Sequence, residues 1–310
     1  ITPMDAPGPV RLISSGPNKG GEERTPSGSS GAQSSRSAAV EKLIGRNIDG
    51  YVLRKLLGAG GMGAVFQALQ VSLERDVAFK ILSPRLSGNP DFLARFTREA
   101  LNAAQLNHHN VIQVHDVGNE GEIHYITMEF VRGQSLGQMI KRDGRLQMDD
   151  AAAYVLQAAR GLKYAHDQKI IHRDIKPDNL MLNEHGVVKI ADMGLAKRIG
   201  ATEKTPTGEA PPSGGRGSED PHLTQADVAM GTPAYMAPEQ ARDAGSVGAQ
   251  ADQYSLGCTL YYLCAGCTPH SGTTAFELIS KHLKEPITPL DVHVQNVPPA
   301  LSLILNRMLE

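Results

Sequence analysis

The sequence predicts an α+β fold in which a small β-rich lobe precedes a larger α-rich lobe. Between residues 48 and 131, short apolar stretches with many β-branched residues are bounded by turn residues, as is typical of strands. From Asp149 onward, apolar residues recur at helical spacing over long segments. A chain of 310 residues is long enough for two such lobes that share a cleft.

Four stretches of the β-rich lobe predict strands. YVLRKLLGAGGMGAVFQAL at 51–69 reads as strand, glycine turn and strand, and RDVAFKIL at 75–82 is a further strand. VIQVHDVG at 111–118 and IHYITMEFV at 123–131 follow. The lobe is therefore expected to be mostly sheet.

One helix interrupts these strands. Asn89 followed by Pro90 is a start signal, because asparagine caps free N–H groups and proline suits the first helical turn. The run DFLARFTREALNAAQLN then places apolar residues at helical spacing. These residues mark the inward face of the helix: Phe92, Phe96, Ala100 and Ala103.

Two long helices are predicted in the α-rich lobe. DDAAAYVLQAARGLKYAHDQ at 149–168 has the pattern of an amphipathic helix, and QADQYSLGCTLYYLCAG at 250–266 is a more apolar one. The chain starts at Ile1 rather than methionine and ends in the helical-looking run PPALSLILNRMLE. We therefore expect a fragment of a longer protein.

Two regions are polar and rich in Ser, Gly and Pro. Residues 1–44 have few groups to bury, so the entropy lost on ordering cannot be offset, and we expect a disordered leader. The second region runs from about residue 198 to 227. A loop this long in a compact domain is either functional or disordered.

The composition excludes several classes of protein. Hydrophobic residues make up 40% and charged residues 21%, as in ordinary soluble proteins. The net charge of −2 indicates no nucleic-acid partner and no anionic membrane surface. No apolar run approaches the roughly 20 residues that span a bilayer, so no membrane segment is expected in this fragment.

The three cysteines lie close together near the C-terminus. An odd count favours a reducing compartment over a secreted disulfide framework. Cys264 and Cys267 form a CxxC, but a metal site would need a second ligand pair, and none is placed for it. Together with Cys258 they lie in an apolar stretch, which favours structural cysteines.

The glycine stretch GAGGMGAV places Gly58, Gly60 and Gly63 in G-x-G-x-x-G spacing. In a dinucleotide-binding fold this motif would open a helix, but here AVFQAL alternates like a strand. The glycines are thus expected at a hairpin tip, where backbone N–H groups can lie over phosphates. A flexible hairpin turn without a ligand is the alternative.

Lys80 lies in an apolar strand, where a lysine is almost never buried without a partner. Glu99 falls on or beside the apolar face of the predicted helix and needs a cation in turn. We predict that the two side chains pair. The pair would be either purely structural or a device that orients Lys80 toward phosphates.

Two further stretches concentrate charged residues beside apolar segments. IIHRDIKPDNLML contains His172, Arg173, Asp174, Lys176 and Asn179, a density that is costly unless a ligand or metal uses it. VVKIADMGLAK at 187–197 is a strand followed by a turn that carries Asp192. By itself, Asp192 is either a metal ligand or an ordinary turn aspartate.

These motifs, in this order, resemble the eukaryotic-like (Hanks-type) serine/threonine protein kinases found in bacteria. The sequence carries the glycine loop at 58–63, VAFK at 77–80, Glu99, HRDIKPDN at 172–179, DMG at 192–194, GTPAYMAPEQ at 231–240 and ADQYSLG at 251–257. The resemblance extends from about residue 48 to the last residue. It implies a bilobal protein-kinase fold, with an ATP-binding N-lobe at 45–131 and a C-lobe at 132–310 that is incomplete at its C-terminal end.

The resemblance also implies roles for the charged residues. Asp174 should accept or orient the substrate hydroxyl, and Lys176 should contact the transferred phosphoryl group. Lys80, oriented by Glu99, should hold ATP phosphates. Asn179 and Asp192 should bind Mg²⁺, or Mn²⁺ in its place. Asp252 should hold the backbone of the catalytic loop from beneath; a helix-start aspartate is the alternative reading.

ATP should lie between the lobes. Val65, Ala78 and Met181 would sandwich the adenine, with Met128 at the back of the pocket and the backbone of Glu129 to Val131 bonded to the base. The glycine loop completes the nucleotide-binding set: Leu57, Gly58, Ala59, Gly60, Gly61, Met62 and Gly63.

Regulation is expected in the activation segment, residues 192–239. Arg173 usually pairs with a phosphate on this segment in the family, and Thr224 is the favoured site. Thr232 and Glu239 belong to the expected substrate platform. The weaker phosphorylation candidates are Thr202, Thr205, Thr207, Ser213 and Ser218.

The sequence departs from the family at three points. Met193 stands where phenylalanine is usual, and the activation segment is lengthened. The chain also stops before the late helix whose arginine pairs with the glutamate of APE, here Glu239. We expect Met193 to pack against His172 and Ala103 and to take no part in the chemistry.

The function expected from these residues is transfer of the ATP γ-phosphoryl group to Ser/Thr hydroxyls of proteins, with self-association for trans-autophosphorylation. A pseudokinase scaffold is the alternative, although Lys80, Asp174, Asn179 and Asp192 are all present. A small-molecule kinase would lack GTPAYMAPEQ, and Lys176 disfavours a tyrosine kinase. A cytoplasmic domain is expected, in a protein that a further C-terminal part could anchor to a membrane.

Overall fold

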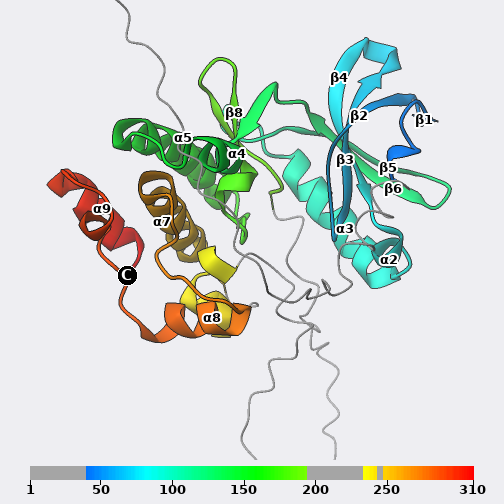
Figure 1. Cartoon of the computed structure of the whole chain (residues 1–310). Helices are drawn as coiled ribbons and strands as arrows, with labels where there is room; N and C mark the ends of the chain where they lie inside the picture. The colour runs from blue at the N-terminus through cyan, green and yellow to red at the C-terminus, as the bar shows by residue number, and fades with distance from the viewer. Residues whose placement is uncertain (1–39, 194–232, 243–246) are drawn as a thin grey trace, which may run out of the picture.

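The computed structural model describes residues 40–193, 233–242 and 247–310 of the chain (Figure 1). An antiparallel sheet with one long helix forms the N-terminal lobe, and helices form most of the C-terminal lobe. The predicted α+β, bilobal arrangement is therefore confirmed.

The N-terminal lobe is built on a six-stranded sheet with the order β1-β2-β3-β4-β6-β5, and each strand is antiparallel to its neighbours. The strands are β1 (Asn47–Ile48), β2 (Tyr51–Gly60), β3 (Gly63–Gln70), β4 (Arg75–Leu82), β5 (Val114–Glu120) and β6 (Ile123–Glu129). A short 3₁₀ turn, η1 (Val71–Leu73), joins β3 to β4. Strands β1 to β4 pair in chain order, whereas β4 pairs with β6 rather than with β5, which forms the edge of the sheet.

The β2–β3 hairpin places the glycine stretch at its tip, as predicted. Gly60 pairs with Gly63 at the end of the ladder. Gly63 has a φ of +141°, and a Cβ there would lie 1.8 Å from the carbonyl oxygen of Ile81 on β4. Only glycine fits this position, because a side chain would collide with the neighbouring strand.

Helix α3 (Pro90–Ala104) lies against this sheet, preceded by the short α2 (Pro84–Ser87) (Figure 1). The Asn89 side chain accepts hydrogen bonds from the N–H groups of Asp91 and Phe92, which satisfies donors that the helix leaves free. The residues predicted for the inward face are the buried ones: Phe92, Phe96, Ala100 and Ala103.

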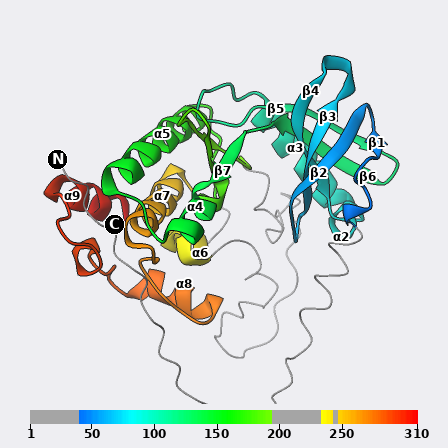
Figure 2. The same cartoon turned by 45° about the horizontal axis from the view of Figure 1, so that its top comes forward.

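The C-terminal lobe consists of helices packed around α7, which is apolar on all sides and buried along most of its length (Figure 2). Helices α5 and α9 contact α7. The helices are α4 (Leu136–Asp143), α5 (Met148–Asp167), α6 (Pro238–Arg242), α7 (Ala249–Ala265), α8 (Ala275–Lys284) and α9 (Pro299–Met308). The 3₁₀ turns are η2 (Pro177–Asn179), η4 (Pro233–Tyr235) and η5 (Leu290–Val292).

A small three-stranded sheet joins the lobes. It consists of β7 (Gly133–Ser135), β8 (Leu180–Asn183) and β9 (Val188–Ile190), all antiparallel. Beside β9 runs the segment 110–113: Ile112 donates to Ile190, and Ile190 donates to Asn110. The same segment accepts a backbone hydrogen bond from Glu129, at Gln113 O. Segment 110–113 therefore connects β9 with the end of β6.

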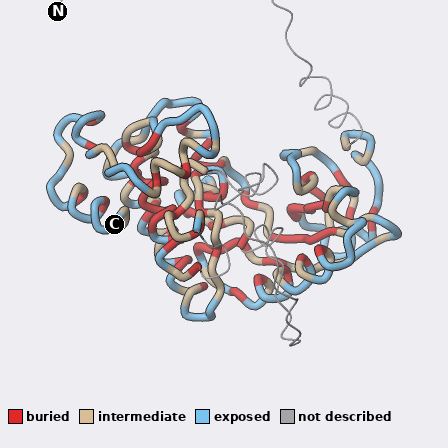
Figure 3. Tube along the Cα trace, turned by 90° about the horizontal axis from the view of Figure 1, so that it is seen from below, coloured by how far each residue is buried: buried red, intermediate tan, exposed pale blue. Residues whose placement is uncertain are grey.

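One buried cluster extends through both lobes (Figure 3). It contains Phe96 of α3, Ile126 of β6 and Leu260 of α7. A second cluster, around Phe66, Phe79 and Tyr125, fills the other face of the sheet. The first cluster therefore includes buried side chains from both lobes.

Residues near the start of the described chain are ordered. Val40 and Leu43 pack against the second cluster, and Gly45 N donates to Leu53 O. Residues 40–44, which belong to the leader predicted for 1–44, are therefore held against the N-terminal lobe, because their apolar side chains cover its buried cluster. Within the described ranges, no helix is long and apolar enough to cross a membrane.

Candidate active site

The loop at residues 172–179, between α5 and β8, is fixed from beneath by Asp252 of α7. This carboxylate is fully buried and accepts hydrogen bonds from His172 N at 2.8 Å and Arg173 N at 2.6 Å. His166 Nε2 lies 2.8 Å from the same carboxylate. A buried carboxylate needs such partners, so the predicted position of Asp252 under this loop is confirmed.

Two residues of this region have backbone angles that side chains rarely adopt. Arg173 has a φ of +66° and Asp192 a φ of +57°. Left-handed conformations of non-glycine residues cost free energy, about 1–3 kcal/mol each, and persist only where their surroundings enforce them. One strained position, Arg173, directly precedes Asp174, and the other, Asp192, is itself a predicted metal ligand.

Asp174, Lys176 and Asn179 form one hydrogen-bonded group. Lys176 Nζ lies 2.8 Å from Asp174 Oδ2, and Asn179 Nδ2 donates to the Asp174 carbonyl at 2.8 Å. The side chains of Asp174 and Lys176 are 14% and 20% exposed. The carboxylate is therefore held in place and still reachable from solvent.

His172 links this group to the strand end that carries Asp192. Its Nδ1 accepts from Asp174 N at 3.2 Å, which leaves Nε2 to donate to the Ala191 carbonyl at 2.8 Å. On the other side, Ala191 N donates to Asn179 O at 2.8 Å. Ala191, the residue before Asp192, is thus bonded to the loop through both its N–H group and its carbonyl.

Asp192 pairs with Lys80 across the lobes. Lys80 Nζ on β4 lies 2.6 Å from Asp192 Oδ1, and the lysine is only 7% exposed. Burial raises the pKa of the Asp192 carboxyl, but Lys80, His172 and Lys176 together lower it more, so the pKa lies below its usual value. The carboxylate is therefore ionised, and an ordinary turn aspartate does not account for this contact.

Glu99 lies half-buried on α3, one residue before the buried Ala100. The ion pair that the structure describes for Lys80 is with Asp192. The Glu99 residue also takes part in a polar or electrostatic interaction. A Lys80–Glu99 pair remains a prediction.

The residues predicted to surround adenine belong to one apolar cluster. Ala78, Met128 and Val131 are buried in it, and Val65 and Met181 pack against it. They come from β3, β4, β6, the link after β6, and β8. Leu57, predicted for the same pocket, is 43% exposed on β2. The structure thus brings together apolar side chains from both lobes.

Glu129, at the end of β6, is held by two different groups. Its backbone N–H donates to Gln113 O at 2.8 Å, and its carboxylate lies 2.9 Å from Lys189 Nζ. Lys189 is on β9, three residues before Asp192, and is 15% exposed. Sequence reasoning missed this contact, because nothing in the pattern of β9 distinguishes an ion-paired lysine from a solvated one.

The residues after the undescribed stretch 194–232 return to the loop through Gln240. Gln240 on α6 donates its Nε2 to the Arg173 carbonyl at 3.0 Å. Glu239 lies beside it, half-buried. Thr224 and Thr232, and the weaker phosphorylation candidates, lie outside the described residues. Gln240 was not predicted as a site residue, although its place in the APEQ sequence was the available signal.

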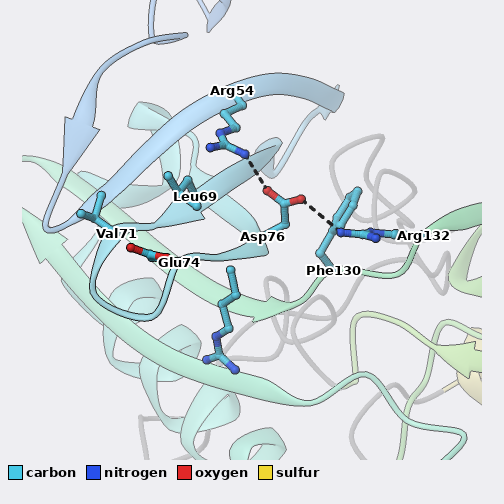
Figure 4. Close-up of a pocket in the computed structure, with 8 residues that line it drawn as sticks. Arg54, Leu69, Val71, Glu74, Asp76, Phe130 and Arg132 are labelled. Atoms are coloured by element: carbon cyan, nitrogen blue, oxygen red, sulfur yellow. Dashed lines mark hydrogen bonds and ion pairs between the residues drawn. The ribbon is translucent and has the colours of Figure 1, made fainter.

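A separate hollow of about 670 Å³ lies on the N-terminal lobe near the link to the C-terminal lobe (Figure 4). Arg54 and Arg132 both point toward Asp76 there, at 3.2 Å and 3.7 Å. Because one carboxylate faces both guanidinium groups, their positive charge is partly offset. Of the residues lining this hollow, only Phe130 falls within a stretch predicted to bind nucleotide, Glu129 to Val131; they are Arg54, Leu69, Val71, Glu74, Arg75, Asp76, Phe130 and Arg132.

Comparison with known proteins identifies the class to which this fold and this loop belong. Residues 51–310 match the protein kinase domain family. The chain is therefore a member of the protein kinase family.

Its relatives narrow the class to bacterial serine/threonine kinases. PknA of Mycobacterium tuberculosis, a serine/threonine-protein kinase, is 38% identical over 253 residues, which is 80% of this chain and 54% of that protein. The probable serine/threonine-protein kinase PknB of Bifidobacterium longum is 37% identical over 257 residues, 80% of this chain and 35% of that protein. The chain thus spans 35% to 54% of the length of these relatives.

A solved structure supports the same assignment. The crystal structure of the Mycobacterium tuberculosis PknI kinase domain matches with a TM-score of 0.62 and 27% sequence identity. The match covers 86% of this chain and 90% of that one. The resemblance inferred from the motifs is confirmed at the level of family and fold.

Proposed function

We propose that this chain transfers the γ-phosphoryl group of ATP to serine or threonine hydroxyls of proteins. One observation carries the proposal: Asn179 of the hydrogen-bonded Asp174–Lys176–Asn179 group accepts from the N–H of Ala191, the residue before Asp192, and Asp192 pairs with Lys80. A base, two cations and two oxygen donors then surround one site. Phosphoryl transfer needs such positioning and charge stabilisation.

Asp174 orients the attacking hydroxyl, and its hydrogen bonds fix the direction of the carboxylate. Lys176, already 2.8 Å from Asp174, reaches the phosphoryl oxygens as negative charge develops on them. Lys80 holds the other phosphates. The apolar cluster around Ala78, Met128 and Met181 accepts the adenine.

The glycine loop supports this placement of the phosphates. A Cβ added at Gly58, Gly60 or Gly61 would have no other described atom within 4 Å. Packing of the described residues therefore does not require glycine at these positions. A phosphate lying against the bare backbone does require it.

The residues predicted to hold Mg²⁺ fit that ion. Asn179 uses its Nδ2 on the Asp174 carbonyl, so its amide oxygen is the atom left for a cation. With the ionised Asp192 carboxylate it supplies the oxygen donors that Mg²⁺ prefers, and that Mn²⁺ accepts. The ion would neutralise charge on the phosphate oxygens when bound.

We further propose that activity is regulated by phosphorylation within residues 192–239, with Thr224 as the first candidate, ATP as the phosphoryl donor and a second copy of the chain as the kinase that transfers the group. Arg173 is the residue that would pair with this phosphate. Mass spectrometry of active protein tests the site, and an unmodified Thr224 would remove it.

The experiment is transfer of labelled γ-phosphate from ATP with Mg²⁺ to the chain itself and to a basic protein rich in serine and threonine. Asp174→Asn and Lys80→Met should reduce incorporation by at least about a hundredfold, since both remove groups that act on the transition state. Lys163→Met, which changes an exposed lysine on α5, is the control. Equal labelling by all four proteins, or none by the unmodified chain, would exclude the proposal and leave a nucleotide-binding scaffold.

A further inference from the structure

Arg173, the residue before Asp174, has both of its backbone polar groups held by side chains. Its N–H donates to Asp252 Oδ1 at 2.6 Å, and its carbonyl accepts from Gln240 Nε2 at 3.0 Å. The carbonyl belongs to the same peptide unit as Asp174 N, which donates to His172 Nδ1. Gln240 therefore fixes the peptide plane that leads into Asp174.

The other end of the Gln240 amide is bonded within its own segment. Gln240 Oε1 accepts from Ala237 N at 3.2 Å, and the side chain is 9% exposed. The amide oxygen thus accepts one hydrogen bond and the amide nitrogen donates another, which fixes the orientation of the group. We call residues Pro233–Arg242, which comprise η4 and α6, the platform segment.

Strain at Arg173 makes this contact matter. The φ of +66° at Arg173 would relax if its surroundings allowed it. Asp252 holds the peptide before Arg173, and Gln240 holds the peptide after it. Loss of the second contact would let that peptide rotate, and the Asp174 carboxylate would move with it.

We propose that Gln240 is a positioning residue for phosphoryl transfer: it ties the platform segment to the peptide that sets the direction of Asp174. The inference rests on the proposed kinase function and deepens it. Placement of the platform segment, against which a peptide substrate lies, then aligns the catalytic carboxylate through a single amide.

The test uses Gln240→Glu. Glutamate has nearly the same shape and still accepts from Ala237 N, but it cannot donate to the Arg173 carbonyl. Two reactions are measured on the same protein, phosphorylation of a basic protein and hydrolysis of ATP by water. Because Asp174 serves both reactions, we expect kcat of both to fall by about tenfold to a hundredfold, the usual cost of a small misplacement.

KM separates positioning from binding. The hydrogen bonds that the described residues give Gln240 lead to Ala237 and Arg173, not to Lys80 or Asp192, so KM for ATP should stay within about twofold while kcat falls. Gln157→Glu is the matched control, since Gln157 Oε1 also accepts from a backbone N–H, that of Val188 at 2.9 Å, and its Nε2 also donates to a backbone carbonyl, that of Gly186 at 3.1 Å, outside the platform segment and the loop. We expect it to lower the melting temperature and to leave kcat for ATP hydrolysis unchanged.

Other outcomes overturn the inference. Unchanged kcat in Gln240→Glu would do so, as would a loss confined to the KM for the protein substrate. Gln240→Met, which keeps the volume and removes both hydrogen bonds, gives the same test if the glutamate variant folds poorly. Absence of both reactions in the unmodified chain would instead exclude the proposed function, and the inference with it.

Discussion

Met193 occupies the position after Asp192 where the family usually has phenylalanine. The side chain is 4% exposed and belongs to the same buried cluster as Ala103 of α3. It therefore packs beneath the site, where an unbranched and flexible side chain can fill an irregular space.

Replacement of Met193 by phenylalanine should leave kinase activity similar or raise it. A ring is stiffer than a thioether chain of similar bulk, so it would hold the turn at Asp192 more rigidly. The measurement is kcat of Met193→Phe and of unmodified protein, with melting temperatures to detect overpacking. A large loss of kcat in a folded variant would contradict this account.

At the level of single residues, the sequence indicated which residues carry charge at the site better than it indicated which residues they contact. Asp192 could not be distinguished from a turn aspartate by its local pattern, and its ion pair with Lys80 became visible only in the structure. The contacts of Gln240 and Lys189 were not predicted. Gln240 donates to a backbone carbonyl, and Lys189 pairs with a carboxylate that is distant in the sequence. Local pattern carries no signal for partners that tertiary structure brings near.

Among the secondary-structure elements, periodicity predicted α3 and β4 well. The bounds of β4 are those expected, and the inward face of α3 is the buried one. The strand expected at 111–118 begins later, at Val114. The residues expected to begin this strand form other hydrogen bonds. The N–H of Ile112 donates to Ile190 of β9, and the carbonyl of Gln113 accepts from Glu129. Bonds to a distant strand cannot be read from alternation alone.

The Lys189–Glu129 ion pair should contribute measurably to stability. It links β9 to the end of β6, and its side chains are 15% and 31% exposed. A double-mutant cycle with Lys189→Met and Glu129→Gln should give a coupling free energy of about 1 kcal/mol. Urea unfolding measures it, with midpoints and m-values for all four proteins.

The pair Lys163–Asp167 is the matched control for that cycle. It lies within α5, and its side chains are 76% and 60% exposed. Solvent screening limits such helix pairs to about 0.3–0.5 kcal/mol. Equal coupling in the two cycles would show that the link between β9 and β6 has no special weight.

For the molecule as a whole, stability should fall in mild acid because of a buried histidine. His282 on α8 is 6% exposed, its Nδ1 lies 2.7 Å from the Tyr254 hydroxyl, and the His270 ring is 4.9 Å away. Burial first, and His270 second, lower the pKa of His282 to about 4. Burial also lowers the pKa of His270, with Glu285 and Lys281 acting in opposite directions.

The unfolded chain, with a histidine pKa of about 6.5, takes up this proton before the folded protein does. The contribution of His282 to the free energy of unfolding is therefore fully present above about pH 6.5, and it is lost as the pH falls toward 4. Between pH 7 and pH 5 the loss should be about 2 kcal/mol.

Urea unfolding at several pH values measures this loss. His282→Asn should flatten the dependence on pH, whereas His185→Asn, at an exposed histidine, should not. An unchanged pH profile in His282→Asn would contradict the assignment.

The arrangement of the lobes was predicted correctly because the motifs fix the family and the family fixes the architecture. The contacts between lobes were not predictable in the same way, since they join residues far apart in sequence. Asn110, for example, donates to Val188 O and lies near Gln157 of α5. Such contacts depend on packing of the whole chain.

The Lys80–Asp192 pair has a consequence for the order in which ligands bind. Each partner neutralises the other across the two lobes, at 2.6 Å, before any ligand arrives. Nucleotide alone would draw the ammonium away and leave a carboxylate facing phosphate. A divalent ion alone would displace the ammonium into apolar surroundings. Only the two together exchange both partners without leaving a charge unmatched, so each should tighten the binding of the other by the same factor.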